Sequence, residues 1–407
     1  MEKYFNDIVQ AISKIVTFDS SLSPAIGDMP FGKGAKDSLD YFLSLAASFG
    51  FETHNYDNYV GEVVFGEGEE LGILAHLDVV PAGGGWTHEP FGGEIDTDRI
   101  WGRGTMDDKG PAIICLYAMK ALKDEGFSPK KKIKLIVGCN EECGWECMKH
   151  YAKVAHMPKI GFSPDANFPV IYAEKGIYHF ETDFPLPDAP FTKFCGGERV
   201  NMVCDRCHAT AKDGKELVEV GKSAHASTPE FGENAILKML LHFISDPRIE
   251  EIVSLLFTDV YGLKEMEDET GKLTLSPNVA RFENGVLTIA SDIRFPSTHT
   301  LEEVKSILDK FGKTRRDLNY QAPLYNDPNS FLISTLQKVY AEATGEKAEP
   351  IAIGGGTYAR ALSCGAGFGP EQDGEEQTIH QANEYITFRK IRFCADIYYR
   401  AIKALSE

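Results

Sequence analysis

Predicted strands and helices alternate at both ends of this sequence, and a different pattern lies between them. A helix is predicted over Pro111–Glu125, a strand over Lys132–Cys139 and a second helix over Glu146–Val154. This alternation is typical of βαβ units, in which helices cover a mostly parallel sheet. We therefore expect an α/β domain, built from residues 1–176 and 321–407.

The middle of the chain, residues 177–320, has strands of the antiparallel type. Predicted strands cover Ile177–Asp183 and Val286–Arg294, and a predicted helix over Asn234–Ser245 lies between them. The segment Asp183–Ala189 contains two prolines and is predicted to be a linker. The pattern predicts that residues 177–320 form an α+β domain inserted into the α/β domain.

The charge and the cysteines of the chain exclude several classes of protein. The 42 Lys and Arg residues and 61 Asp and Glu residues give a formal net charge of −19. Phosphate backbones and anionic membranes repel such a chain, so we expect neither nucleic acid nor a membrane as a partner. Met1–Thr17 lacks the pattern of a signal peptide, and nine scattered cysteines suit a reducing compartment. We therefore expect a cytoplasmic protein.

Carboxylate and histidine side chains follow several predicted strands of the α/β domain. Because ligands gather outside the carboxyl ends of parallel strands, these side chains are expected to meet at one edge of the sheet. The carboxylates would repel one another without cations, and carboxylate and imidazole ligands suit Zn²⁺ or a similar divalent ion. Alone, each residue is more often a polar cap, a surface group or part of a turn. The set comprises His76, Asp78, Asp107, Asp108, Glu141, Glu142, Asp165 and His380.

These residues lie in motifs that resemble the M20 family of metallopeptidases. The similarity covers nearly the whole chain, and it implies a two-domain fold in which a metal-binding catalytic domain carries an inserted lid. The motif Gly354-Gly355-Gly356-Thr357 and the late histidine resemble the bacterial dipeptidase branch, the PepV-like or Xaa-His dipeptidases. The remaining motifs are His76-Leu77-Asp78-Val79-Val80-Pro81, Gly102-Arg103-Gly104, Asp107-Asp108-Lys109-Gly110 and Glu141-Glu142, followed by Asp165.

The resemblance assigns metal-binding roles to five residues. Asp107 would bridge two divalent metal ions. His76 and Asp165 would complete the first site. Glu142 and His380 would complete the second. We expect the ions to be Zn²⁺, although Mn²⁺ and Co²⁺ suit the same ligands.

Further roles implied by the resemblance surround the ions. Two ions ~3.5–4 Å apart would lower the pKa of a shared water, whose proton Glu141 would accept as general base and pass to the leaving amine. Asp78 would hydrogen-bond the second ring nitrogen of His76. The family also places a cis peptide bond after the bridging aspartate, here between Asp107 and Asp108.

The inserted domain resembles the lid of the family. His225 matches a lid histidine that donates to the developing oxyanion, and Asn201 resembles a further lid contact. Arg294 would clamp the free carboxylate of the substrate, while an ordinary strand-end salt bridge is the alternative. The segment Gly355-Gly356-Thr357 would bind substrate near the same carboxylate through backbone donors, and a plain tight turn is its alternative.

One stretch departs from the family pattern. The segment between Asn201 and His225 is shorter than expected, so part of the lid is predicted to be trimmed. It contains Cys204-Asp205-Arg206-Cys207-His208, which matches a motif for covalent haem attachment. That chemistry requires an exported protein, which disfavours haem here. We expect the thiols around the glutamate pair to be buried rather than metal-binding, namely Cys139, Cys143 and Cys147.

The sequence therefore predicts a metallopeptidase that hydrolyses dipeptides as a monomer. An M20 amidase acting on N-acyl amino acids is the nearest alternative, because the same metal centre serves both reactions. A non-catalytic small-molecule binding protein is a second alternative, but it would be expected to lack a ligand or the base, and all six positions are filled. A haem electron carrier is the third.

Overall fold

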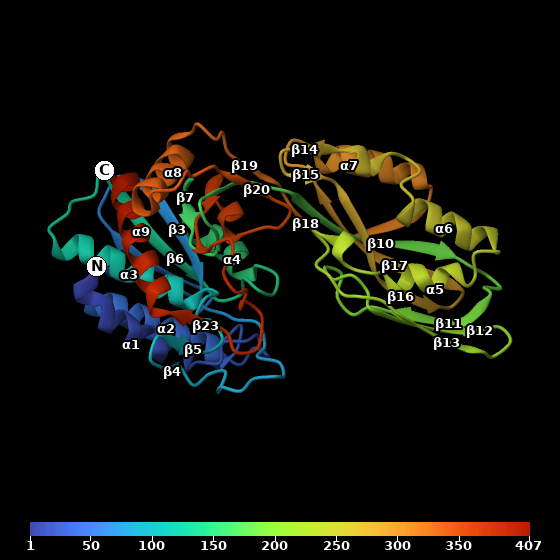
Figure 1. The fold of residues 1–407 in the computed structure, drawn as a ribbon, viewed down its shortest axis with the longest axis horizontal. Coiled ribbons are helices and arrows are strands. Elements are labelled where there is room, and N and C mark those ends of the chain that lie inside the picture. Colours follow the sequence, from blue (N-terminus) through green and yellow to red (C-terminus); the bar gives the residue numbers. More distant parts are fainter. The chain divides into compact units, whose positions relative to one another are not determined.

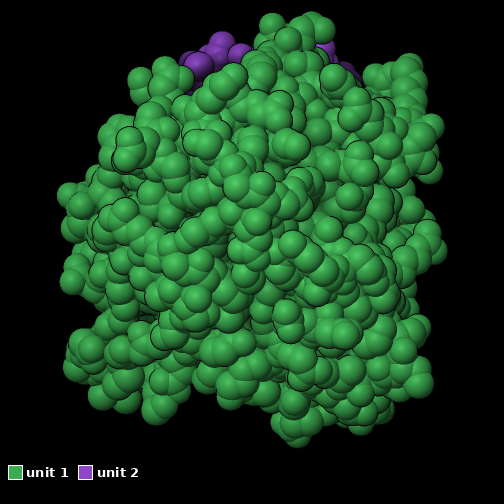
Figure 2. All heavy atoms as spheres, turned by 90° about the vertical axis from the view of Figure 1, so that its left-hand side faces the viewer, with its two compact units in different colours: residues 1–172, 326–351, 357–407 green, residues 173–325, 352–356 purple.

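The computed structural model describes residues 1–407 and divides the chain into two compact units. Unit 1 consists of residues 1–172, 326–351 and 357–407. Unit 2 consists of residues 173–325 and 352–356. Figure 1 labels the elements of each unit, and Figure 2 shows one face of unit 1 in green. The roles of the two units as catalytic domain and lid stay a prediction.

The centre of unit 1 is a mixed sheet, which confirms the expected α/β fold. Its four central strands, β6, β3, β7 and β21, run parallel, and the strands that flank them pair in the antiparallel direction. The mostly parallel character that the sequence predicted thus applies to the centre. The strand order is β1 (Glu52–Tyr56), β2 (Val60–Phe65), β6 (Lys131–Gly138), β3 (Glu69–His76), β7 (Ile160–Ser163), β21 (Cys364–Gly367) and β9 (Ile171–Glu174).

Six α-helices belong to unit 1, and the apolar helix α3 packs against the C-terminal helix α9. Residues on all sides of α3 are buried, as expected for a helix that is apolar around its circumference. The predicted helix Glu146–Val154 has the bounds of α4, and the other predicted helices agree with the structure to within a few residues. The helices are α1 (Phe5–Val16), α2 (Lys33–Ser48), α3 (Lys109–Asp124), α4 (Glu146–Val154), α8 (Phe331–Thr344) and α9 (Phe388–Ser406).

Two short strand groups, separate from the main sheet, pair distant loops of unit 1. β5 (Arg99–Trp101) pairs with both β4 (Glu94–Ile95) and β23 (Tyr385–Thr387). β8 (Ala166–Asn167) pairs with β22 (Pro370–Glu371) in the parallel direction. These pairings connect the late part of the chain to loops that follow early strands.

Glycine allows a close approach of the central strands of unit 1. Gly161 of β7 lies beside Gly72 of β3 and Gly365 of β21, and a Cβ added at Gly161 would collide with the backbone carbonyl of Gly72. We expect Gly161→Ala to destabilise the protein by about 1–3 kcal/mol, because the strands must move apart. Denaturant unfolding measures this change. Gly84→Ala is the control, since an added Cβ there has no atom within 4 Å; equal stability of both variants would contradict the packing argument.

Unit 2 contains a seven-stranded antiparallel sheet covered on one face by helices (Figure 1). Buried side chains of α5 (Ala235–Leu241), α6 (Pro247–Phe257) and α7 (Leu301–Leu308) form one hydrophobic core with those of the sheet. The strand order is β13 (Glu216–Val220), β12 (Arg206–Ala211), β11 (Phe191–Gly196), β16 (Thr274–Glu283), β17 (Val286–Phe295), β10 (Gly176–Pro185) and β18 (Thr314–Gln321).

The predicted linker at Asp183–Ala189 is wrong. This segment connects β10 to β11 inside unit 2, where Leu186 is buried and its N–H donates to the carbonyl of Gly285 at 2.7 Å. The two prolines mark a tight connection instead. The chain passes between the units at β9, β19 (Leu324–Tyr325) and β20 (Ile351–Ile353), and again between Gly356 and Thr357. No helix in the structure has both the length and the apolar composition needed to cross a membrane.

Candidate metal centre

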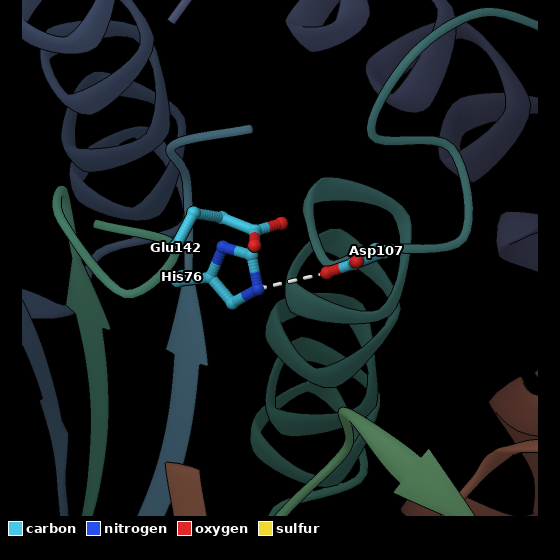
Figure 3. Close-up of side chains that lie close together, drawn as sticks. All are labelled: His76, Asp107 and Glu142. Atoms are coloured by element: carbon cyan, nitrogen blue, oxygen red, sulfur yellow. Dashed lines mark ion pairs between the residues drawn. The ribbon is translucent and has the colours of Figure 1, made fainter. Parts of the chain in front are cut away.

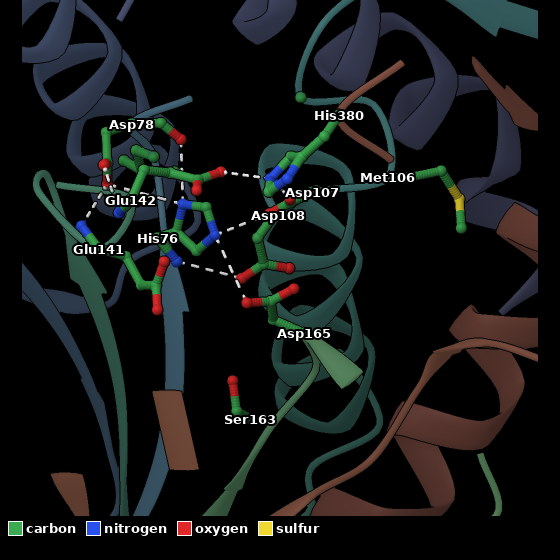
Figure 4. Close-up of polar contacts among 12 residues, drawn as sticks. His76, Asp78, Met106, Asp107, Asp108, Glu141, Glu142, Ser163, Asp165 and His380 are labelled. Carbon is green, nitrogen blue, oxygen red and sulfur yellow. Dashed lines mark hydrogen bonds and ion pairs between the residues drawn. The ribbon is translucent and has the colours of Figure 1, made fainter. Parts of the chain in front are cut away.

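The five predicted metal ligands come from distant parts of the sequence and meet in unit 1. His76 ends β3, Glu142 follows β6 and Asp165 follows β7. Since β6, β3 and β7 are neighbouring parallel strands, their carboxyl ends lie at the same edge of the sheet. Asp107 lies just before α3, and His380 lies in the loop that leads to β23. Figure 4 shows these side chains turned toward one another.

Asp107 lies between the two histidines. One of its carboxylate oxygens, Oδ1, is 2.9 Å from Nε2 of His76 (Figure 3). The other oxygen, Oδ2, is 2.8 Å from Nε2 of His380. Each carboxylate oxygen therefore faces one imidazole, which is the arrangement that a bridging ligand requires.

Each histidine also faces a second carboxylate. Oδ2 of Asp165 lies 3.5 Å from Nε2 of His76, and Oε1 of Glu142 lies 3.0 Å from Nε2 of His380. Ligand atoms of His76, Asp107 and Glu142 all lie within 4.8 Å of one another. The structure thus brings the residues together as two groups that share Asp107.

The hydrogen bonding of His76 fits a cation at this place. Its Nδ1 lies 3.0 Å from the backbone carbonyl oxygen of Asp78, so Nδ1 carries the ring proton. Nε2 is buried and forms no hydrogen bond, although it faces carboxylate oxygens of Asp107 and Asp165. A lone pair that faces negative oxygens is unfavourable unless a cation lies between them. The donor set therefore fits a divalent metal ion.

The electrostatics of the cluster also favour the binding of positive charge. Burial, together with the charge of Asp107, raises the pKa of Glu142 to about 7, and the same two causes raise the pKa of Asp165. Burial opposes protonation of His380, but the carboxylates of Asp107 and Glu142 raise its pKa to about 11. Divalent cations would stabilise the ionised carboxylates and take the place of protons on the imidazoles.

Asp78 contacts both His76 and the glutamate pair. Asp78 hydrogen-bonds the second ring nitrogen of His76 as predicted, but through its backbone carbonyl, while its carboxylate Oδ1 lies 3.6 Å from Nδ1. The carboxylate accepts the backbone N–H groups of Glu141 at 2.9 Å and Glu142 at 3.1 Å. Asp78 therefore fixes the tautomer of His76 through its main chain and the turn after β6 through its side chain.

Glu141 lies beside the ligands, and the structure gives it no contact with either histidine. Nε1 of Trp145 donates to Oε1 of Glu141 at 3.1 Å. Burial raises the pKa of Glu141 well above its ordinary value, the charge of His76 lowers it, and the neighbouring Glu142 raises it again. A buried carboxylate with a raised pKa beside a candidate metal site has the surroundings that the predicted general base requires.

The peptide bond between Asp107 and Asp108 is cis, as the resemblance predicted. Oδ2 of Asp108 accepts the backbone N–H of His76 at 3.1 Å. Asp108 thus ties the loop before α3 to the end of β3, although it faces neither imidazole.

Two predicted lid residues are neighbours within unit 2. The backbone N–H of Ala226 donates to the carbonyl of Asn201 at 2.9 Å, which places Asn201 beside the His225 loop. Nδ1 of His225 accepts the backbone N–H of Ser227 at 3.2 Å. In the neutral imidazole the proton therefore lies on Nε2, which makes this nitrogen a donor.

Arg294 forms a bidentate salt bridge inside unit 2. Its Nε and Nη2 groups donate to the two carboxylate oxygens of Asp292 at 2.7 and 2.9 Å. Asp292 is fully buried and also lies 2.8 Å from Nε2 of His179. The salt bridge that the sequence left open as an alternative is present, and it does not use the Nη1 group.

The predicted substrate segment Gly355-Gly356-Thr357 contains the end of a loop and the start of a short helix. Gly355 and Gly356 belong to unit 2, whereas Thr357 belongs to unit 1. Oγ1 of Thr357 accepts the backbone N–H of Ala359 at 3.3 Å and caps the 3₁₀ helix Tyr358–Ala361. The hydroxyl of Thr357 therefore has a structural role.

Several side chains that support the site could not be identified from the sequence motifs. Trp145 was not singled out, and neither were the buried partners Arg103 and Glu384. Arg103 belongs to a quoted motif, which was the only signal for this pair. A single buried glutamate such as Glu384 has no pattern of its own.

The cysteines form no disulfide in this structure. Cys204 and Cys207 are buried in the core of unit 2, which disfavours the attachment of haem to them. Near the glutamate pair, Cys139 and Cys147 are buried as predicted, whereas Cys143 is exposed.

The chain matches the model of a known protein family and is similar to known proteins. The model of peptidase family M20/M25/M40 matches residues 72–404. The chain is 34% identical over 456 aligned positions to the Beta-Ala-Xaa dipeptidase of Lactobacillus delbrueckii subsp. lactis, covering 98% of this chain and 96% of the relative. Because this alignment is longer than the 407 residues of the chain, the relative contains residues without a counterpart here.

Solved structures with the same fold include two dipeptidases. The di-peptidase Dug1p from Saccharomyces cerevisiae has a TM-score of 0.67 at 13% identity, with 100% of this chain and 97% of that chain covered. Aminoacylhistidine dipeptidase from Vibrio alginolyticus has a TM-score of 0.61 at 14% identity, with 97% and 95% covered. At these identities the likeness establishes the fold.

Proposed function

The chain belongs to peptidase family M20/M25/M40, and from this we propose that it is a metal-dependent dipeptidase with two divalent ions at its active site. The observation that carries the proposal is the position of Asp107, with one carboxylate oxygen toward His76 and the other toward His380. His76, Asp107 and Asp165 would hold one ion. His380, Asp107 and Glu142 would hold the other.

The residues of the site support hydrolysis by an activated water. Bound divalent ions would supply Lewis acidity, which lowers the pKa of water and polarises a carbonyl oxygen. Glu141 would accept the proton of the attacking water and pass it to the leaving amine. Trp145 would hold the side chain of Glu141 in place. Asp78, which hydrogen-bonds both the backbone of Glu141 and the ring of His76, would keep these two residues next to each other. His225 would donate from Nε2 to the oxygen of the scissile carbonyl.

Zn²⁺ is the ion that we propose first, because two imidazoles and three carboxylates suit it, and Mn²⁺ and Co²⁺ fit the same donors. We place the enzyme in the cytoplasm as a monomer. The nine cysteines form no disulfide in the structure, which agrees with a reducing compartment.

Dipeptides are the substrate class that the relatives favour over N-acyl amino acids, since the matched relative is named as a dipeptidase. One experiment tests both parts of the proposal. Metal content would be measured by mass spectrometry on the same sample that is assayed with a dipeptide, its N-acetyl derivative and its C-terminal amide. A preference for the N-acetyl derivative would favour the amidase alternative.

We propose that Arg294 binds the free carboxylate of the substrate through its Nη1 side. Arg294→Ala is expected to lower kcat/KM for a dipeptide by about 10- to 100-fold and to affect the dipeptide amide much less. A guanidinium forms a bidentate pair with a carboxylate, and its interaction with a neutral amide is weaker. Steady-state kinetics on the dipeptide and its amide measure the difference.

Arg294→Lys is the matched control, because it keeps a cation beside the buried Asp292 while it removes the planar fork. Unfolding curves of both variants would separate lost stability from lost binding. If a dipeptide and its amide lose activity equally in both variants, Arg294 has only the structural role of its bridge to Asp292.

A further inference from the structure

A buried carboxylate that touches no imidazole connects the loops of two metal ligands. Glu384 is completely buried in unit 1, four positions after His380. Its Oε1 accepts three backbone N–H groups at distances of 2.9 to 3.3 Å. The three donors are those of Gly104, Met106 and Asp107.

The second oxygen of Glu384 has a partner of its own. Oε2 accepts from Nη1 of Arg103 at 2.7 Å, and this guanidinium is also buried. The same Nη1 group donates to the carbonyl of Gln381 at 3.2 Å, one residue after His380. The backbone carbonyl of Glu384 accepts the N–H of Gly102 at 2.9 Å. Glu384 and Arg103 therefore fasten the loop of residues 102–107 to the loop of residues 378–384.

The two fastened loops present neighbouring ligands. Asp107 donates its own N–H to Glu384, and its side chain reaches both histidines. His380 has a positive φ of 61°, which is uncommon for a non-glycine residue, and the contacts of its loop hold it in place. The 2.8 Å separation of Asp107 Oδ2 from His380 Nε2 therefore depends on contacts that fix both loops.

We propose that Glu384 is a positioning residue that sets the geometry of the metal centre by holding Asp107 and His380 together. All contacts of its carboxylate are with backbone N–H groups and Arg103, so it acts through the ligands and does not bind an ion itself. The inference rests on the metal centre proposed above.

Glu384→Gln tests this role with little change of shape. The amide oxygen still accepts the backbone N–H groups, but the amide nitrogen faces Arg103 and leaves that cation without its partner. We expect the metal-free variant to bind Co²⁺ about 10- to 100-fold more weakly than the metal-free wild-type protein in calorimetric titration. The visible absorption spectrum of bound Co²⁺ should also change, because it reports ligand geometry.

Glu62→Gln is the matched control. Glu62 is also buried in unit 1 and forms an ion pair of 3.3 Å with the buried Lys134, away from the metal ligands. This variant should lose stability while its Co²⁺ affinity and spectrum stay those of the wild type. Wild-type affinity and spectrum for Glu384→Gln, or equal weakening in Glu62→Gln, would overturn the positioning role.

A second variant covers the case in which Glu384→Gln does not fold. Arg103→Lys keeps a cation opposite Glu384 but loses the shared contact with Gln381, so it should weaken Co²⁺ binding and alter the spectrum to a smaller degree. Wild-type Co²⁺ binding by this variant would contradict the inference. Metal binding is measured without substrate, so absence of dipeptide hydrolysis by the wild-type protein would contradict the proposed function while leaving the positioning role open to this test.

Discussion

Glu141→Gln is expected to lower kcat by about 10²–10⁴-fold or more while metal content stays at the wild-type value. The amide has the shape of the carboxylate and its oxygen still accepts from Nε1 of Trp145, so the surroundings of residue 141 are retained. The amide cannot accept a proton from water, which removes the step that we assign to Glu141. Single-turnover kinetics and metal analysis of the same preparation measure the two effects.

The neighbouring Glu142 supplies the control for this substitution. Glu142→Gln alters the residue that lies 3.0 Å from His380, so we expect it to lose one ion. Both variants change one of two adjacent carboxylates to an amide, but Glu142 contacts His380 whereas Glu141 contacts Trp145. A metal-free Glu141→Gln protein would show that Glu141 is a ligand and that the assigned roles are wrong.

Much of unit 1 could be predicted because its signals are local. The strand that ends at His76 is an apolar run, and α4 has the apolar periodicity of a helix. The rule that parallel strands share a carboxyl edge then brings His76, Glu142 and Asp165 together without knowledge of the packing. His380 follows no strand of the parallel set, so this rule does not place it, and its role as a ligand came from the family resemblance.

The errors arise where tertiary contacts decide the outcome. Asp183–Ala189 looked like a linker because of its prolines, but the burial of Leu186 makes it a tight connection within one core. The predicted hydrogen bond between Asp78 and His76 is present, but it uses the backbone carbonyl of Asp78, which side-chain types do not reveal. The role of Glu384 could be recognised only from the backbone N–H groups that the structure places around its carboxylate.

The pairing of Arg294 shows a related limit. Asp292 and Arg294 are two positions apart in β17, so both side chains point to the same face of the sheet and can meet. This spacing allows the salt bridge, which the sequence left open as an alternative to the carboxylate clamp. Binding of a substrate carboxylate by the same guanidinium stays a prediction, which the comparison of a dipeptide with its amide tests.

Removal of divalent ions is expected to abolish hydrolysis completely, and their return should restore it. The physical reason is the cluster of Asp107, Asp165 and Glu142, in which burial and mutual repulsion oppose ionisation of the last two carboxylates. The same removal should lower the melting temperature, because ions that bind only the folded state stabilise it by about 2.7 kcal/mol at 100 times their Kd. Exhaustive chelation, verified by metal analysis, would be followed by assays after addition of Zn²⁺, Mn²⁺ or Co²⁺.

Two substitutions sharpen this test, because the proposed ligands differ in how many ions they contact. Asp107→Asn changes the carboxylate that faces both histidines and should lose both ions. Asp165→Asn changes a carboxylate that faces only His76 and should lose one ion. Asp165→Asn makes the same carboxylate-to-amide change in the same cluster. An equal loss of metal from both variants would therefore contradict the bridging role of Asp107. Full activity of verified metal-free protein would contradict the metallopeptidase itself.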